Sequence, residues 1–389
     1  DWWSFAAFVR KMGCMSQEGI GMEKQLIEWF EWFHKNPELS YEEYNTTAKI
    51  REILTQAGLE ILPFELETGL VAVIRGKEPG PVSALRCDID ALPIVEETEL
   101  SYASCHEGKM HACGHDFHIT AGLGCALLLN ERKEELAGTV KIIFQPAEES
   151  SLGALKILET PVMEDVEEIW GIHADPTNEA GVLGIREGSV SAAVDRFVVT
   201  VKGNSCHGAH PDDGVDPIPV AAAIVQAFQT IVTRNINAFH PGLISVTRME
   251  AGNTWNVIPE SAVLEGTVRT MDRKDRVLVE KRMKEIAENT AKAYGAEAEV
   301  KWIPGPPAVF NDALMVEKSI QTAHECGFDV VPEEASMGGD DFSFYEERIP
   351  GCYIKIGTGK GQLIHQPGFQ VNEKVIWPTV KFLTKLLNC

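Results

Sequence analysis

The segment MHACGHDFH, residues 110–118, concentrates side chains that can bind a metal ion. It holds three histidines, one cysteine and one aspartate. Thiolate and imidazole together suit a borderline transition metal such as zinc and are poor ligands for calcium or magnesium. In an extended loop, Cys113 and His115 would lie on the same side of the chain and converge on one metal ion, whereas on a helix they would point apart. Scattered buried polar residues are the simpler alternative, but the density of these side chains favours a metal site.

Two pairs of carboxylates also follow apolar segments. Glu148 and Glu149 come after the apolar run 139–144 and a proline. In an extended backbone they would point apart, so that one could bind a metal ion while the other accepts a proton from water. Asp88 and Asp90 lie on one side of the chain by alternation, where one could orient a ligand histidine. Solvated surface is the alternative for the glutamates, and an N-cap or loop acid for the aspartates.

Two further histidines extend the set of candidate ligands. His173 ends the apolar segment 169–173, and the choice between ligand and structural residue stays open for it. His365 lies near a proline, where a surface-loop histidine is the simpler interpretation. Five candidate ligands exceed one tetrahedral set, which suggests two metal ions that share a bridging ligand. The candidates are Cys113, His115, Glu149, His173 and His365.

A second group of candidate residues lies further along the chain. The segment SCHGAHP contains His207 and His210, and a histidine on a mobile lid could stabilise a developing oxyanion. Asn256, in GNTWNVIPE, and Arg269, in GTVRT, are candidate partners for a substrate carboxylate. Structural hydrogen bonding is the alternative for both.

Strands alternate with helices around the first group. The apolar run 119–129 predicts a buried helix with Asp116 near its first turn. An amphipathic stripe predicts a helix over 23–32, and Ser40 is expected to cap the next helix, which ends near Gly58. This alternation predicts a largely parallel sheet with the site at the carboxyl ends of its strands.

The pattern changes near Ser189. Strand and helix periods then follow the order β-α-β-β-α-β, which is typical of a ferredoxin-like unit. An exposed sheet edge in such a unit can pair with a second copy. We therefore expect a two-domain α/β protein whose catalytic domain has a mixed, mostly parallel sheet and carries an inserted ferredoxin-like lid and dimerisation domain. The expected ranges are 22–188 and 303–389 for the catalytic domain and 189–302 for the insertion.

Length and composition agree with a two-domain globular protein. The chain has 389 residues, of which 44% are hydrophobic and 24% are charged. A net charge of −23 argues against a nucleic-acid partner, and no apolar run is long enough to span a membrane. Nine cysteines at irregular spacing favour reduced thiols and a cytoplasmic location. Residues 1–21 are expected to be an extension ahead of the fold.

The motifs together resemble those of the M20 metallopeptidase family, in its amidohydrolase branch of aminoacylases, hippurate hydrolases and auxin-conjugate hydrolases. The resemblance implies a two-metal amidase in which the five candidate ligands bind zinc or manganese, with nickel or cobalt as further candidates. It also implies that Glu148 is the general base and that His207 reaches from the lid, in many relatives into the partner subunit's site. Two positions depart from the family pattern, because Cys206 replaces the usual glycine and Asp340 the usual glutamate. The matching motifs are RCDIDALPI, MHACGHDFH, FQPAEES, GIHADP, CHGAHP, NVIPE, GTVRT and MGGDDFS.

We therefore expect a metal-dependent amidohydrolase that cleaves the amide bond of small N-acyl amino acids, with Glu148, Asp90 and His207 as its catalytic residues. Glu148 would take a proton from water and return it to the leaving amine. A metallo-dipeptidase or carboxypeptidase of the same family is the alternative within this chemistry. Less favoured are a covalent mechanism, with Cys113 as nucleophile and His115 as its base, and an inactive metal-binding protein. A homodimer formed through the insertion is the expected assembly.

Overall fold

The structure is a computed structural model that describes residues 17–64 and 66–388. Most of the expected N-terminal extension, residues 1–16, lies outside this part. The described residues divide into two compact units, each with its own apolar core. Unit 1 contains the residues up to Val190, together with Phe310–Glu334 and the chain from Asp341 on, and unit 2 contains Ser191–Val309 and Ala335–Asp340.

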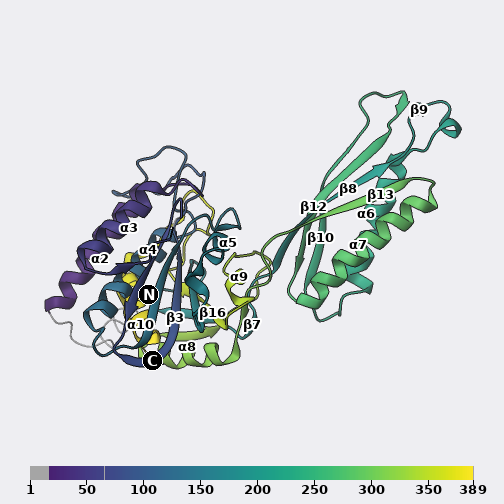
Figure 1. The fold of residues 1–389 in the computed structure, drawn as a ribbon. Helices are drawn as coiled ribbons and strands as arrows, with labels where there is room; N and C mark the ends of the chain where they lie inside the picture. Colours follow the sequence, from purple (N-terminus) through teal and green to yellow (C-terminus); the bar gives the residue numbers. More distant parts are fainter. Residues whose placement is uncertain (1–16, 65, 389) are drawn as a thin grey trace. The chain divides into compact units, whose positions relative to one another are not determined.

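Unit 1 is built on one mixed sheet of eight strands (Figure 1). Its strands, in spatial order, are β1 (Glu60–Ile61), β2 (Leu70–Arg75), β4 (Ala137–Gln145), β3 (Glu78–Asp88), β5 (Glu168–Asp175), β16 (Gly351–Gly357), β6 (Val182–Ile185) and β15 (Asp329–Pro332). The central strands β4, β3, β5 and β16 are mutually parallel, as are β6 and β15, and the remaining pairs are antiparallel. The central strands are largely buried, which explains their continuous apolar runs. The predicted α/β class with a mixed sheet is confirmed.

Three of the helices of unit 1 pack around one central helix. The helices of this unit are α2 (Gln17–Lys35), α3 (Tyr44–Gln56), α4 (His115–Glu131), α5 (Gly153–Leu158), α8 (Ala313–Glu325), α9 (Ser343–Glu346) and α10 (Ile376–Leu386), with the short turns η1 (Pro161–Met163) and η3 (Glu373–Val375). Helices α2, α3 and α10 pack against α4, so that α4 is buried on nearly all sides. Such a helix needs apolar or small residues all round. The helix expected over 119–129 is confirmed, and it begins earlier, at His115.

The prediction that Ser40 caps the second helix was wrong. Helix α3 begins at Tyr44, with Glu43 at the N-cap position. Ser40 Oγ instead donates a hydrogen bond to Asp90 Oδ2 at 2.7 Å. Ser40 therefore supports a candidate site residue rather than the start of a helix.

Unit 2 has the predicted order β-α-β-β-α-β. Its antiparallel sheet has the spatial order β10-β12-β8-β13, and α6 and α7 pack together beside it (Figure 1). A small β9–β11 ladder extends from this sheet, and a second small ladder, β7–β14, belongs to unit 1. The elements are β8 (Ala193–Lys202), η2 (Pro211–Asp213), α6 (Pro217–Arg234), β10 (Gly242–Ala251), β12 (Ser261–Thr270), α7 (Arg273–Ala293), β13 (Glu297–Pro304), β9 (Cys206–His207), β11 (Val257–Ile258), β7 (Gly188–Ser189) and β14 (Phe310–Asn311).

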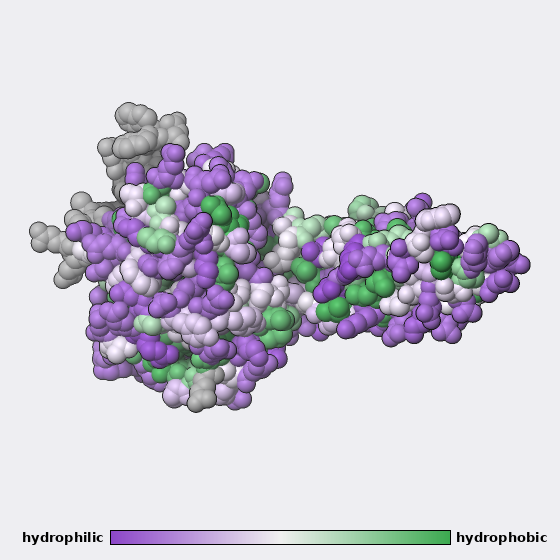
Figure 2. Space-filling model, turned by 90° about the horizontal axis from the view of Figure 1, so that it is seen from above, coloured by the Kyte–Doolittle hydropathy of each residue, from purple (hydrophilic) through white to green (hydrophobic). Residues whose placement is uncertain are grey.

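The surface of both units is mainly hydrophilic on the face that Figure 2 shows. Apolar side chains appear there as separate patches, as expected for ordinary protein surface. Across residues 17–64 and 66–388, no helix combines the length and the apolar character that a membrane span requires.

Candidate active site

A glycine in the left-handed backbone conformation lies between the two candidate ligands Cys113 and His115. Gly114 has φ 86° at the N-cap position of α4, and His115 is the first residue of that helix. The predicted extended loop is therefore wrong, yet the sharp turn at Gly114 still brings the Cys113 and His115 side chains next to each other. A Cβ at position 114 would lie 2.7 Å from the Cβ of Ala174, so only glycine fits.

Donor atoms from distant parts of unit 1 converge beside this turn. One group joins Cys113, Glu149 and His365, and a second joins His115, Glu148 and Glu149. Within each group, the donor atoms lie within 4.8 Å of one another. Glu149 belongs to both groups.

His173 and His365 complete the predicted set. His173 Nε2 lies 3.3 Å from Cys113 Sγ, at the carboxyl end of β5. His365 has a half-exposed side chain, but its Nε2 lies 3.4 Å from Glu149 Oε1. Its main-chain N–H also donates to Ala112 O at 2.8 Å, which ties its loop to the Cys113 segment. The structure thus brings all five predicted ligands together.

The two glutamates lie in a turn rather than in an extended segment. The main-chain N–H groups of Glu148 and Glu149 donate to Asp90 Oδ1 and Oδ2, at 3.1 and 3.0 Å. Because the backbone turns there, both carboxylates approach His115. The prediction that they point apart was wrong for this reason.

Asp90 and Asp88 surround the His115 ring. His115 Nδ1 lies 2.8 Å from Asp90 O and 3.3 Å from Asp90 Oδ1. An Nδ1–H donor to these oxygens leaves Nε2 as the basic nitrogen. Asp88 Oδ2 lies 3.6 Å from His115 Nε2, and Asp88 Oδ1 lies 2.5 Å from His118 Nδ1.

The donor chemistry fits a divalent transition metal. His115 Nε2 and Glu149 Oε1 are buried and make no hydrogen bond among the described residues, although buried polar atoms are normally paired. The 3.4 Å approach of His365 Nε2 to Glu149 Oε1 is not a hydrogen bond. Burial lowers the pKa of His173 well below its usual range, so this imidazole is neutral and can act as a ligand. Sulfur, imidazole nitrogen and carboxylate oxygen together form a zinc-type donor set.

The surroundings of Cys113 do not suit a covalent nucleophile. Burial raises the pKa of its thiol to about 12, even though His115 lies beside it. Activated cysteines sit instead in partly exposed, electropositive surroundings that lower the pKa. The thiol environment therefore favours a ligand over a nucleophile.

Three predicted residues lie on unit 2. His207 is exposed on β9 and pairs with Val257 of β11, and beside this pair Gly208 N donates a hydrogen bond of 2.8 Å to Asn256 O. Asn256 is therefore a neighbour of the His207 segment. Arg269 lies near the far end of β12, where it donates to Val268 O. Within unit 2, the structure brings His207 and Asn256 together but places Arg269 elsewhere.

A family comparison identifies the fold and the class of chemistry. The family model for Peptidase family M20/M25/M40 matches residues 84–388. The chain belongs to this family. It is 44% identical over 363 residues to N-acetylcysteine deacetylase of Bacillus subtilis, covering 93% of this chain and 96% of that protein. A crystal structure of the Bacillus subtilis YXEP protein, a dinuclear metal binding peptidase from the M20 family, is similar with a TM-score of 0.86 at 42% identity, covering 94% and 98% of the two chains.

The resemblance noted from the motifs is thus confirmed, and the chain is an M20 hydrolase. A second protein of Bacillus subtilis, N-acetyl-L-cysteine deacetylase, is 43% identical over 362 residues, or 93% of this chain and 87% of that protein. These matches extend over nearly the whole chain, so they include both units.

The M20 hydrolase also contains a buried ion network that the motifs did not indicate. The Arg86 side chain is fully buried and donates to Asp88 Oδ2 at 2.5 Å, Asp341 Oδ1 at 2.6 Å and Gln145 Oε1 at 2.9 Å. Burial alone would raise the pKa of Asp88, but the Arg86 guanidinium beside it outweighs burial and, with the neighbouring histidines, holds this pKa well below its usual range. An arginine two residues before Asp88 in an apolar strand was the available sequence signal.

A second buried cluster lies behind the ligand turn. His34 Nδ1 lies 2.6 Å from Asp116 Oδ2, and His34 Nε2 lies 3.1 Å from Glu96 Oε1. Burial disfavours the charged ring, but the hydrogen bonds to both carboxylates raise the pKa of His34 to about 9. This imidazolium connects α2 to the first turn of α4, next to His115.

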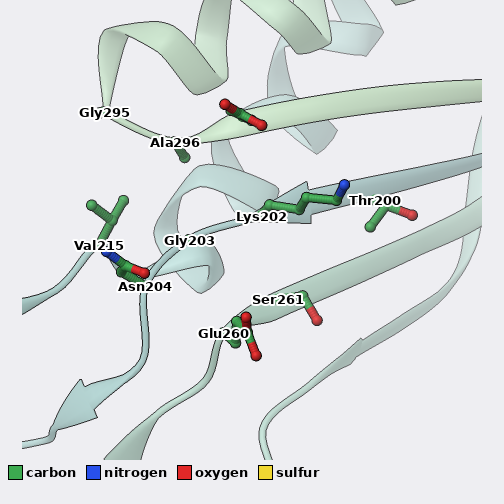
Figure 3. A pocket seen from close by; sticks show the side chains of 10 residues that line it. Thr200, Lys202, Gly203, Asn204, Val215, Glu260, Ser261, Gly295 and Ala296 are labelled. Carbon is green, nitrogen blue, oxygen red and sulfur yellow. The ribbon is translucent and has the colours of Figure 1, made fainter.

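Unit 2 contains a hollow of about 520 Å³ that is lined by residues of that unit (Figure 3). It lies at the ends of β8, β12 and β13, and Lys202, Glu260 and Glu297 are its charged residues. None of the predicted site residues lines it. The candidate active site is therefore the donor cluster of unit 1.

Proposed function

We propose that this M20 hydrolase cleaves the amide bond of small N-acyl amino acids, with N-acetylcysteine as the first candidate substrate. The observation that carries the proposal is the convergence of thiol, imidazole and carboxylate donors beside Glu148. The 44% identity to N-acetylcysteine deacetylase supports an acetyl group and a small amino acid as the two halves of the substrate.

We infer that two divalent metal ions, zinc or manganese, with nickel or cobalt as further candidates, belong to this site. When bound, such ions polarise the amide carbonyl and lower the pKa of water. The five donors exceed the needs of one tetrahedral ion, which supports a pair. The residues that would hold the ions are Cys113, His115, Glu149, His173 and His365.

Glu148 would act as the general base and then as the general acid. Its carboxylate accepts a proton from the attacking water and delivers that proton to the nitrogen of the leaving amine. Asp90 positions both the glutamate loop and the His115 ring. Its carboxylate accepts hydrogen bonds from the N–H groups of Glu148 and Glu149, and its main-chain oxygen accepts one from His115. These hydrogen bonds hold Glu148, the proposed base, within reach of the reacting atoms.

Unit 2 would serve as a ferredoxin-like lid and as a dimerisation domain. Its element order supports the ferredoxin-like topology. Strand β10 lies at the edge of the sheet and is mostly exposed, so that it can pair with a second copy. His207 would stabilise the oxyanion in the site of the partner subunit, and the neighbouring Asn256 would bind the substrate carboxylate there. Arg269 lies at the other end of β12, so it would bind that carboxylate from the other copy of unit 2.

A substrate panel tests the proposed function. The metal-loaded protein should release free amine from N-acetyl-L-cysteine faster than from N-benzoylglycine or from the dipeptide Cys-Gly, and chelation should remove the activity. Faster cleavage of the dipeptide would favour the peptidase alternative. Absence of turnover on every amide, by protein with confirmed metal content, would contradict the proposal.

Subunit exchange tests the role of His207. Separately, His207→Ala and Glu148→Gln variants should each be inactive. After verified exchange of subunits, mixed dimers would combine one intact Glu148 with one intact His207 and recover part of the wild-type rate. No recovery would exclude a contribution of His207 to the partner's site.

A further inference from the structure

The loop that carries Glu148 and Glu149 contains a residue in a backbone conformation that L-amino acids rarely adopt. Ala147 has φ +56°, in the left-handed region where a Cβ crowds the neighbouring carbonyl oxygen. Ala147 is completely buried, so the structure around it must hold this conformation. Ser151, further along the same loop, has φ +61°.

Glu43 accepts the hydrogen bond that holds Ala147. Glu43 Oε1 accepts from Ala147 N at 2.7 Å, and Glu43 Oε2 accepts from Thr68 Oγ1 at 2.8 Å. The Glu43 side chain is completely buried. Burial, and then the charge of Asp90, raise the pKa of Glu43 to about 7. A buried acid with a perturbed pKa beside functional carboxylates is itself a candidate functional group.

Asp90 binds the next two N–H groups of the loop, those of Glu148 and Glu149. Three consecutive backbone N–H groups therefore each donate to a carboxylate oxygen. We propose that Glu43 is a positioning residue: by holding Ala147 in the left-handed conformation, it sets the direction in which the Glu148 and Glu149 side chains leave the backbone. The inference rests on the proposed function of these two glutamates.

Two substitutions of Glu43 separate its hydrogen bond from its charge. Glu43→Met removes both acceptor oxygens at similar volume and should lower kcat for N-acetyl-L-cysteine by about tenfold or more, with a smaller effect on KM, because a misdirected base slows the chemical step. Glu43→Gln keeps an amide oxygen for Ala147 N and should lose markedly less. Equal losses in both variants would implicate the charge and overturn the positioning role.

Replacement of Ala147 by glycine should reduce the loss of kcat that follows from removing Glu43. Glycine adopts a positive φ without strain, so the loss of kcat caused by Glu43→Met should be at least about threefold smaller in the Ala147→Gly background. Ser151→Gly is the matched control, because Ser151 N donates to Glu148 O rather than to Glu43. A loss of equal size in all three backgrounds would overturn the proposal.

Amide hydrogen exchange measures how stably the same loop is held, and it does not depend on catalytic activity. In metal-free protein, Glu43→Met should speed amide exchange in the segment 145–151, and Ala147→Gly should reduce this difference. If Glu43→Met does not fold, Thr68→Val offers a milder change, since it removes the donor to Glu43 Oε2. Should the wild type cleave no N-acyl amino acid while exchange responds as expected, the proposed function fails and the positioning role stands. Unchanged exchange in a folded Glu43→Met variant would overturn the positioning role.

Discussion

Glu148→Gln is expected to lower kcat for N-acetyl-L-cysteine by on the order of a hundredfold or more. Glutamine has nearly the same shape as glutamate, but its neutral amide cannot accept a proton from the attacking water. The N–H group of residue 148 still donates to Asp90, so the loop should keep its conformation. Steady-state kinetics, combined with elemental analysis and thermal unfolding, should show lost turnover at unchanged metal content and Tm.

Glu159→Gln is the matched control for this variant. Glu159 also belongs to unit 1, but its side chain is 66% exposed and pairs with Lys156, and the substitution should leave kcat unchanged. A Glu148→Gln variant with a near-wild-type rate would show that Glu148 is not the base. Accumulation of an acyl-enzyme on Cys113 would revive the covalent mechanism.

Arg86→Met is expected to lower the free energy of unfolding by about 3–5 kcal/mol. The arginine side chain is fully buried between Asp88 and Asp341. Methionine fills much of the same space, but the two carboxylates lose their shared guanidinium in a medium that solvates charge poorly. Urea unfolding at neutral pH measures the difference.

Arg75→Met provides the comparison on a nearby strand. Arg75 lies in β2, is 58% exposed and pairs with Glu60 at 2.9 Å, so its loss should cost no more than about 1 kcal/mol. Equal costs for the two arginine variants would mean that the buried network contributes little to stability.

The sequence predicted what local patterns determine. The apolar run after His118 specified the buried helix α4, and the change of period near Ser189 specified the element order of unit 2. The candidate ligands could also be predicted from the sequence. Thiol, imidazole and carboxylate groups at the ends of apolar segments indicate a metal site even when the three-dimensional arrangement of those segments is unknown.

Long-range contacts and backbone turns could not be predicted from these patterns. Arg86 pairs with Asp341 across 255 residues, and Glu43 binds Ala147 across 104 residues. No periodicity specifies which residue such a polar group will meet. The left-handed turn at Gly114 likewise replaced the expected extended loop, because one φ angle of opposite sign redirects all that follows.

Elemental analysis of the protein purified without chelator tests the central claim most directly. The five donors Cys113, His115, Glu149, His173 and His365 predict about two transition-metal ions per chain. Loss of these ions by dialysis against a chelator should abolish amide hydrolysis, and their return should restore it. A chain that contains no metal and hydrolyses amides at the same rate with or without chelator would contradict the account.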